Sequence, residues 1–244
     1  DRGLFEAIAR DLEAKGATIR KGAIIDATII GSATKGDEEA AWAKHRTRPP
    51  AHGYKAHIAA GKDTGILRAA AAAAANAADA SIAPSIIPDA PGRVFGGKAY
   101  DADSVKQAIK AKGGSSKLLR KGHRWLPPKK FLARNRKLAP IRARIEKIFG
   151  TWKRSYHFRA MRWTGLAKAK LQVHFAVIAY NVKRYWRLQS AGADLTAARE
   201  KPKFAGAKPA ASALSLLNPR LPNRSDLTKG FGFHLAFQPL PSGK

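Results

Sequence analysis

The chain opens with a pattern typical of an amphipathic helix. Within residues 1–15, four large apolar side chains recur at helical spacing: Leu4, Phe5, Ile8 and Leu12. Gly16 follows as a natural helix stop. The next apolar segment, 22–30 (GAIIDATII), is β-branched and apolar on both faces apart from Asp26. It predicts a buried strand with a carboxylate in its middle.

The following residues predict a loop, a hairpin and a short helix. Residues 31–52 are polar and contain an Arg-Pro-Pro step, which indicates a loop. The segments 53–61 (GYKAHIAAG) and 64–69 (TGILRA) predict a hairpin. The alanine run Ala69–Ala75 is compatible with either helix or strand. Asn76–Ile87 predicts a short helix that a proline ends.

A second short strand precedes the basic half of the chain. Residues 93–100 (RVFGGKAY) begin as a strand, and residues 101–114 predict a helix that Asp101 caps and two glycines close. Residues 114–138 are basic and interrupted by prolines. The pattern of strands and helices up to this point indicates an α/β fold.

Two long helices are expected in the basic half. The first runs from about Pro140 to Tyr156, with the proline in its first turn, where no amide hydrogen is needed. The second, roughly Leu166 to Leu188, is apolar enough to pack on the core. Residues 189–244 show little periodicity and much Ala, Pro, Lys and Ser, so they predict a basic, poorly ordered tail.

Charge is distributed very unevenly along the chain. The 244 residues hold 46 Lys and Arg against 17 Asp and Glu, a formal charge of +29. Residues 1–104 contain 14 basic and 13 acidic side chains, whereas residues 105–244 contain 32 and 4. So positive a field is typical of proteins that bind nucleic-acid phosphates. DNA or RNA is the expected partner, and a merely soluble basic protein is the alternative.

The composition also excludes several classes of protein. The absence of cysteine removes disulfide frameworks, Cys-ligated metal sites and thiol nucleophiles. No run of about 18 apolar residues is present, and the first residues lack the order of a secretory signal. We therefore expect a cytoplasmic, nucleoid-associated protein that does not enter a membrane.

Two isolated carboxylates stand out as candidates for chemistry. Glu146 is the only acid in residues 104–193, and on a helix it shares a face with Arg142 and Lys153. It can form an ordinary ion pair with Arg142, or help to hold a metal ion. Asp26, inside an apolar strand, needs solvent, an arginine, a hydrogen bond or a metal. Two such acids converging from a strand and a helix predict a magnesium site for phosphoryl transfer.

Seven segments carry a resemblance to a known family. In order they are LFEAIARDLEAKG, GAIIDATII, HGYKAHI, TGILR, ANAAD, VFGGKAYDAD and RARIEKIFGTWKR. Arg142, Glu146 and Lys153 keep the spacing Arg, three residues, Glu, six residues, Lys, and Ala139 takes the place of a preceding tyrosine. With these motifs, residues 3–188 resemble the DDE transposases of bacterial insertion sequences, whose catalytic core is ribonuclease H-like.

The resemblance implies a fold and a reaction. The fold would be α/β, a ribonuclease H-like mixed sheet flanked by helices. Residues 1–17 would be the remnant of an N-terminal helical region, 18–188 the transposase core, and 189–244 the tail. The reaction would be Mg²⁺-dependent DNA strand cleavage and strand transfer, with Asp26 and Glu146 as catalytic residues and metal ligands.

The second acid of the family's triad is missing. Gly97 stands where the family has an aspartate at the end of a strand, and glycine cannot ligate through a side chain. Asp101 and Asp103 could replace it, although N-capping is the ordinary role of such residues. The resemblance therefore predicts a transposase-derived DNA-binding protein with weak or absent Mg²⁺ binding and impaired cleavage. The alternative is a non-catalytic basic nucleic-acid-binding protein.

Basic residues around the glutamate helix predict a DNA-binding rim. They are Lys129, Lys130, Arg136, Arg142, Lys153 and Arg154. By resemblance, Arg142 and Lys153 would touch the backbone of the transposon end, and Trp163 would stack on an unpaired base. The implied partners are DNA, as transposon ends and target, and a second copy in a homodimer weakened by loss of the N-terminal domain.

Overall fold

Six strands form one mixed sheet in the computed structural model, which describes residues 22–44, 49–122 and 128–190 together with Gly3, Ala7, Arg10 and Asp11. The strands are β1 (Ala23–Gly31), β2 (Ala41–Ala43), β3 (Ala51–Gly61), β4 (Leu67–Ala74), β5 (Arg93–Gly96) and β6 (Ser115–Leu118). The central path is β2-β3-β1-β5-β6, and β4 also pairs with β3.

The direction of the strands changes at β1. β1 runs antiparallel to β3, from Ala23 opposite Gly61 to Gly31 opposite Gly53, and β3 is antiparallel to β4. On its other side β1 is parallel to β5, which is parallel to β6. An antiparallel meander continued by parallel strands is the ribonuclease H-like arrangement, so the predicted α/β class is confirmed.

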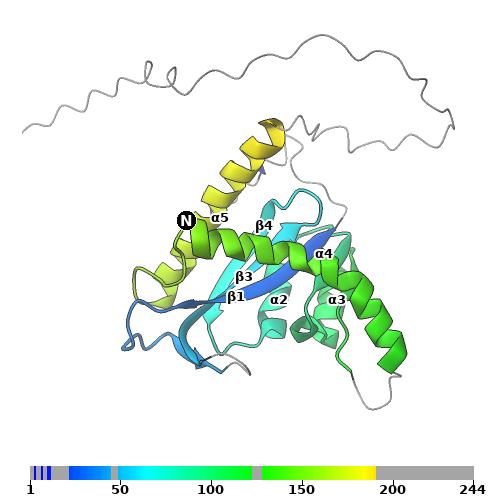
Figure 1. Ribbon diagram of the computed structural model, residues 1–244, viewed down its shortest axis with the longest axis horizontal. Coiled ribbons are helices and arrows are strands. Elements are labelled where there is room, and N and C mark those ends of the chain that lie inside the picture. The colour runs from blue at the N-terminus through cyan, green and yellow to red at the C-terminus, as the bar shows by residue number, and fades with distance from the viewer. Residues whose placement is uncertain are drawn as a thin grey trace, which may run out of the picture. The chain divides into compact units, whose positions relative to one another are not determined.

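Helices cover both faces of the sheet (Figure 1). They are α2 (Asp79–Ile86), α3 (Asp103–Ala111), α4 (Pro128–Ser155) and α5 (Leu166–Ser190), with a 3₁₀ turn η1 (Lys98–Tyr100) after β5. α4 and α5 share one apolar core with the sheet, in which Trp152 and Val173 are buried. α2 and α3 share the other, in which Ile86 and Ile109 are fully buried.

Most predicted elements lie where the pattern placed them. The apolar segment around Asp26 is β1, the hairpin is β3 and β4, and the last apolar pattern is α5. The alanine run, which propensity left undecided, is strand as far as Ala74 because it pairs with β3. The glutamate helix packs on the core through one apolar stripe, in which Ile145, Ile148 and Trp152 are buried.

The start predicted for the glutamate helix is wrong. α4 begins at Pro128, and Pro140 lies inside it. A proline in a helix interior removes one backbone hydrogen bond but does not always end the helix. Residues 129–138 contain Lys, Leu, Ala and Arg, which favour helix, and a proline does occupy the first turn, twelve positions earlier than predicted.

Three further details differ from the sequence analysis. Residues 31–52, expected as a loop, contain the short strand β2, and the basic segment 114–138 contains β6 as well as the start of α4. Asp101 does not cap α3. Its carboxylate instead accepts a hydrogen bond from the Lys121 amide at 2.9 Å and pairs with Lys106 at 3.1 Å.

The predicted terminal regions fall largely outside the described residues. Gly3, Ala7, Arg10 and Asp11 are helical, and the rest of residues 1–17 is not described. The tail prediction for 189–244 lies outside the described residues beyond Ser190. Among the described helices, none combines the length and apolar character needed to cross a membrane.

Asn181 of α5 closes an irregularity in the sheet. The register of β3 and β4 shifts between Ala59 and Ala60. At that point the Asn181 side chain donates to the Leu67 carbonyl and accepts from the Leu67 amide, both at 2.8 Å, in a buried setting. A single side chain therefore ties α5 to β4.

Replacing Asn181 by alanine is expected to lower the free energy of unfolding by about 3 kcal/mol, because a buried amide and a buried carbonyl of Leu67 lose their partner. Urea denaturation followed by circular dichroism measures the loss. Gln189→Ala, at an exposed position of the same helix, is the control and should change stability by less than about 0.5 kcal/mol. Equal losses in the two variants would contradict this role.

Candidate active site

Asp26 lies at the middle of β1, on the face that α4 covers. Its side chain is 13% exposed. In the parallel pair of β1 and β5, Ile25 lies opposite Gly96, so the next residues, Asp26 and Gly97, are neighbours at the end of β5. Asp26 therefore lies beside the carboxyl-terminal end of β5, while β1 itself continues to Gly31.

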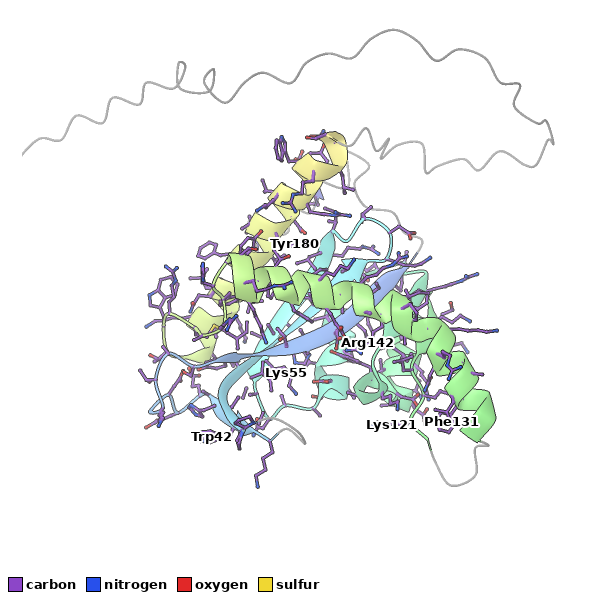
Figure 2. All side chains as sticks on the ribbon, in the orientation of Figure 1. Trp42, Lys55, Lys121, Phe131, Arg142 and Tyr180 are labelled. Atoms are coloured by element: carbon purple, nitrogen blue, oxygen red, sulfur yellow. The ribbon has the colours of Figure 1, made fainter. Side chains whose placement is uncertain are left out.

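Arg142 of α4, which is labelled in Figure 2, joins Asp26 to Glu146. Its guanidinium donates to Asp26 Oδ2 from Nη2 at 2.8 Å and from Nε at 3.2 Å. The same Nη2 lies 3.2 Å from Oε1 of Glu146, one helical turn away. The two acids singled out in the sequence therefore meet at one cation, and that cation is an arginine.

The environments of the two acids differ. Burial raises the pKa of Asp26 above its ordinary value, and the Arg142 guanidinium, which lowers it, compensates only in part. Glu146 keeps 58% of its side chain exposed. Burial lowers the pKa of Arg142, but the attraction of Asp26 and Glu146 outweighs this and holds the pKa above its usual range. Arg142 is therefore charged and held mainly by the buried acid.

Gly97 leaves room where a third carboxylate would stand. Its backbone is extended, with φ −69° and ψ 172°, a conformation open to any residue. A Cβ built on Gly97 would meet only Arg142 Nε, at 3.7 Å, an ordinary van der Waals distance. The backbone at Gly97 could therefore carry an acidic side chain beside Arg142 without rearrangement, and only the side chain itself is absent.

The side chains present do not fit a pair of magnesium ions. Each Mg²⁺ needs oxygen ligands, usually from carboxylates that remain accessible. Here Asp26 and Glu146 share the Arg142 guanidinium, and Gly97 adds no oxygen. Within residues 22–44, 49–122 and 128–190, no group of three His, Cys, Asp or Glu side chains could hold a metal ion.

The two candidate replacements for the missing acid are engaged elsewhere. Asp101 and Asp103 both pair with Lys106, at 3.1 and 3.0 Å. Asp103 is also 90% exposed, and Asp101 accepts a hydrogen bond from Lys121. These contacts are made to α3 and to the segment after β6, and none of them involves Asp26 or Arg142.

The predicted basic rim divides between two faces of α4. At about 100° per residue, Lys153 shares the face of Arg142 and Glu146. Arg136 and Arg154 are exposed about 100° further round the helix, on a face that Lys147 shares. We call Arg136, Lys147 and Arg154 the outer cationic face. Lys147 was missed, although its helical spacing from Arg136 and Arg154 could have indicated it.

The other predicted DNA contacts are placed as follows. Lys129 and Lys130 lie in the first turn of α4, but their side chains are outside the described part of the chain. Trp163 lies between α4 and α5 and is 46% exposed. Arg142 is held by two acids and is therefore less available to phosphate than the sequence suggested.

A polar cluster on the opposite face of the sheet was not foreseen. Lys55 of β3 pairs with Asp79 of α2 at 2.9 Å, with both side chains largely buried. His57, fully buried on the same strand, finds no hydrogen-bond partner among the described residues, and burial lowers its pKa to about 4. Tyr100, after Gly97, is also buried, which raises its pKa. Only alternation along β3 could have placed Lys55 and His57 on one face.

The order of the strands and the acids on β1 and α4 define a ribonuclease H-like domain. Residues 18–182 match the family model described as "Transposase DDE domain", which covers more than half of the chain. The chain belongs to this family, and its function is related to transposition.

A curated relative agrees with this assignment. The chain is 27% identical over 217 aligned positions to the "Transposase for insertion sequence element IS1106" of Neisseria meningitidis serogroup B. The match covers 73% of this chain and 70% of that protein.

Proposed function

We propose that this chain is a transposase-derived protein that binds DNA and whose metal-dependent strand cleavage is impaired. One observation carries the proposal: the Arg142 guanidinium bridges Asp26 and Glu146 beside the bare backbone of Gly97. DNA strand cleavage followed by strand transfer is the ancestral reaction that the family implies.

The charge balance at this position disfavours divalent ions. In the family's triad, three carboxylates would face the metals, whereas here two carboxylates face one guanidinium. A Mg²⁺ ion would have to displace Arg142 from Asp26, and breaking a partly buried ion pair leaves an uncompensated charge behind. The remaining acids would then supply too few oxygens for two ions.

DNA binding does not depend on these acids. The outer cationic face carries Arg136, Lys147 and Arg154, all exposed. Their charges can neutralise backbone phosphates whether or not a metal binds at Asp26. We propose transposon-end and target DNA as the partners of this surface, with Lys153 and Trp163 as further DNA contacts. Association with the nucleoid and formation of a homodimer are further parts of this proposal.

A nicking assay on supercoiled plasmid tests the proposal. With Mg²⁺ present, the natural chain is expected to convert plasmid no faster than its Glu146→Gln variant, because the carboxylate removed is paired with Arg142. Gel electrophoresis of the topological forms measures both rates. Robust nicking that Glu146→Gln abolishes would refute impaired cleavage.

The second candidate is a basic nucleic-acid-binding protein with no remaining catalytic architecture. The Asp26–Arg142–Glu146 bridge favours this second candidate, because the bridge forms a structural ion-pair network in which Arg142 pairs with both acids. The two candidates differ in what a carboxylate restored at Gly97 would do.

A further inference from the structure

α5 carries an apolar stripe on the side turned away from the core. Phe175, Val182 and Trp186 are 49%, 55% and 66% exposed. At about 100° per residue these positions fall within roughly 40° of one another, and opposite Val173 and Val177, which are buried. Exposed aromatic and aliphatic side chains aligned on one helix face are typical of an interaction surface. We call Phe175, Val182 and Trp186 the outer α5 stripe.

We propose that the outer α5 stripe is the docking site of residues 1–15 of this same chain. That segment presents four large apolar side chains at helical spacing: Leu4, Phe5, Ile8 and Leu12. Fifteen residues of helix are about 22 Å long, which exceeds the approximately 16 Å from Phe175 to Trp186 along α5. One amphipathic helix is therefore long enough to cover the stripe.

The chain enters the described domain close to α5. The carbonyl of Gly22, just before β1, accepts a hydrogen bond from the Lys62 amide at 2.9 Å. Two residues further in the same turn, the Thr64 carbonyl accepts a hydrogen bond from Arg184 Nε of α5 at 2.7 Å. Residues 16–21 can span up to about 20 Å. A helix with its side chains is only about 10–12 Å across, so residues 1–15 can reach the far side of α5.

The net charges of the two segments are opposite in sign. α5 contains five cations and no acid: Lys168, Lys170, Lys183, Arg184 and Arg187. Of these, Lys168 lies in line with the outer α5 stripe, two turns before Phe175, and Lys183 lies about 60° to one side of Trp186 on the helical wheel. Residues 1–15 contain four acids, Asp1, Glu6, Asp11 and Glu13, against three cations, Arg2, Arg10 and Lys15. A second copy of α5 would instead oppose cations to cations, which disfavours a symmetric α5 pair.

The described residues of the N-terminal segment are consistent with this orientation. Gly3, Ala7, Arg10 and Asp11 are helical and exposed. At about 100° per residue these four positions fall within an arc of about 100°, which adjoins, without overlapping, the arc of the four apolar positions. The segment would therefore turn its polar side to solvent and its apolar side to α5.

Disulfide trapping tests the docking, since the chain has no cysteine of its own. The full-length double variant Ile8→Cys/Val182→Cys is expected to form an intrachain disulfide under mild oxidation. The matched control, Arg10→Cys/Val182→Cys, moves the first thiol to the opposite side of the segment and should react at least about tenfold more slowly, because its effective concentration near Val182 is lower. Non-reducing electrophoresis and peptide mass spectrometry identify the products.

A third variant and two alternative products complete the test. Adding Phe5→Asp to the reactive pair should slow trapping by about tenfold, because it places a charge in the apolar contact. Equal rates for Ile8→Cys and Arg10→Cys would overturn the proposal. So would covalent dimers formed by Val182→Cys alone, which would mean a second copy covers the stripe. A third contradicting result would be faster disulfide formation in Leu216→Cys/Val182→Cys than in Ile8→Cys/Val182→Cys, which would mean that the C-terminal tail covers the stripe.

Discussion

Replacing Gly97 by aspartate is expected to raise Mg²⁺-dependent nicking of supercoiled plasmid by about 100-fold over the natural chain. The substitution puts a third carboxylate beside Asp26 and Glu146, at the end of the strand parallel to β1. Metal ions in such sites lower the barrier by several kcal/mol, and about 3 kcal/mol corresponds to about 100-fold in rate.

The geometry at Gly97 makes this substitution mild for the fold. The extended backbone accepts a side chain without strain, and the nearest atom to a new Cβ is Arg142 Nε at 3.7 Å. The introduced carboxylate would compete with Asp26 for the guanidinium and thereby release oxygens for metal. The variant should consequently bind DNA as the natural chain does while gaining a metal requirement.

Two controls separate catalysis from other effects of the change. Gly97→Asn has the same size but no charge and should leave nicking at background. Gly97→Asp combined with Glu146→Gln should lose the gained activity. If Gly97→Asp is inert while its DNA affinity is unchanged, the chain is a basic DNA-binding protein without recoverable catalysis, and the impaired-enzyme interpretation fails.

DNA affinity is expected to fall by about 10³-fold or more between 50 and 200 mM salt. This loss corresponds to the release of counterions from roughly six or more phosphates. The charge of residues 105–244, 32 basic against 4 acidic side chains, supplies more than enough cations for that number of contacts. Fluorescence anisotropy with a duplex of random sequence measures the slope.

The outer cationic face gives this prediction a residue-level test. Each of Arg136→Gln, Lys147→Gln and Arg154→Gln should reduce the slope of log affinity against log salt by about 0.9. The matched control is Lys35→Gln, because Lys35 is exposed but belongs to the nearly neutral half of the chain. Affinity that stays flat across this salt range would contradict phosphate-driven binding.

The parts of the fold that follow from local burial could be predicted from the sequence. β1 was recognisable because its apolar residues continue on both faces, and α5 because its apolar residues recur at helical spacing. Pro140 misled the assignment of α4, since propensity cannot show when tertiary contacts hold a helix together through a proline. Packing of Ile145, Ile148 and Trp152 against the sheet supplies those contacts.

The sequence singled out Asp26, Arg142 and Glu146 as candidate site residues, but it could not show that Arg142 pairs with Asp26. The isolation of Asp26 and Glu146 marked both acids, and spacing placed Arg142 next to Glu146. Whether a buried carboxylate meets a metal or an arginine depends on how far a helix shifts along a sheet, and periodicity carries no such information. The polar cluster of Lys55, His57 and Asp79 could not be predicted either, because it joins residues from separate elements whose relative placement periodicity does not give.

The bare, unstrained backbone at Gly97 has a genetic consequence. Every glycine codon becomes a codon for aspartate or glutamate by one change at its second base. Because the position tolerates a side chain without any compensating change in the fold, no second mutation stands between the present chain and one with three acids at this site. Copies of the gene that differ at this base would therefore report whether selection maintains a glycine or an acid at position 97.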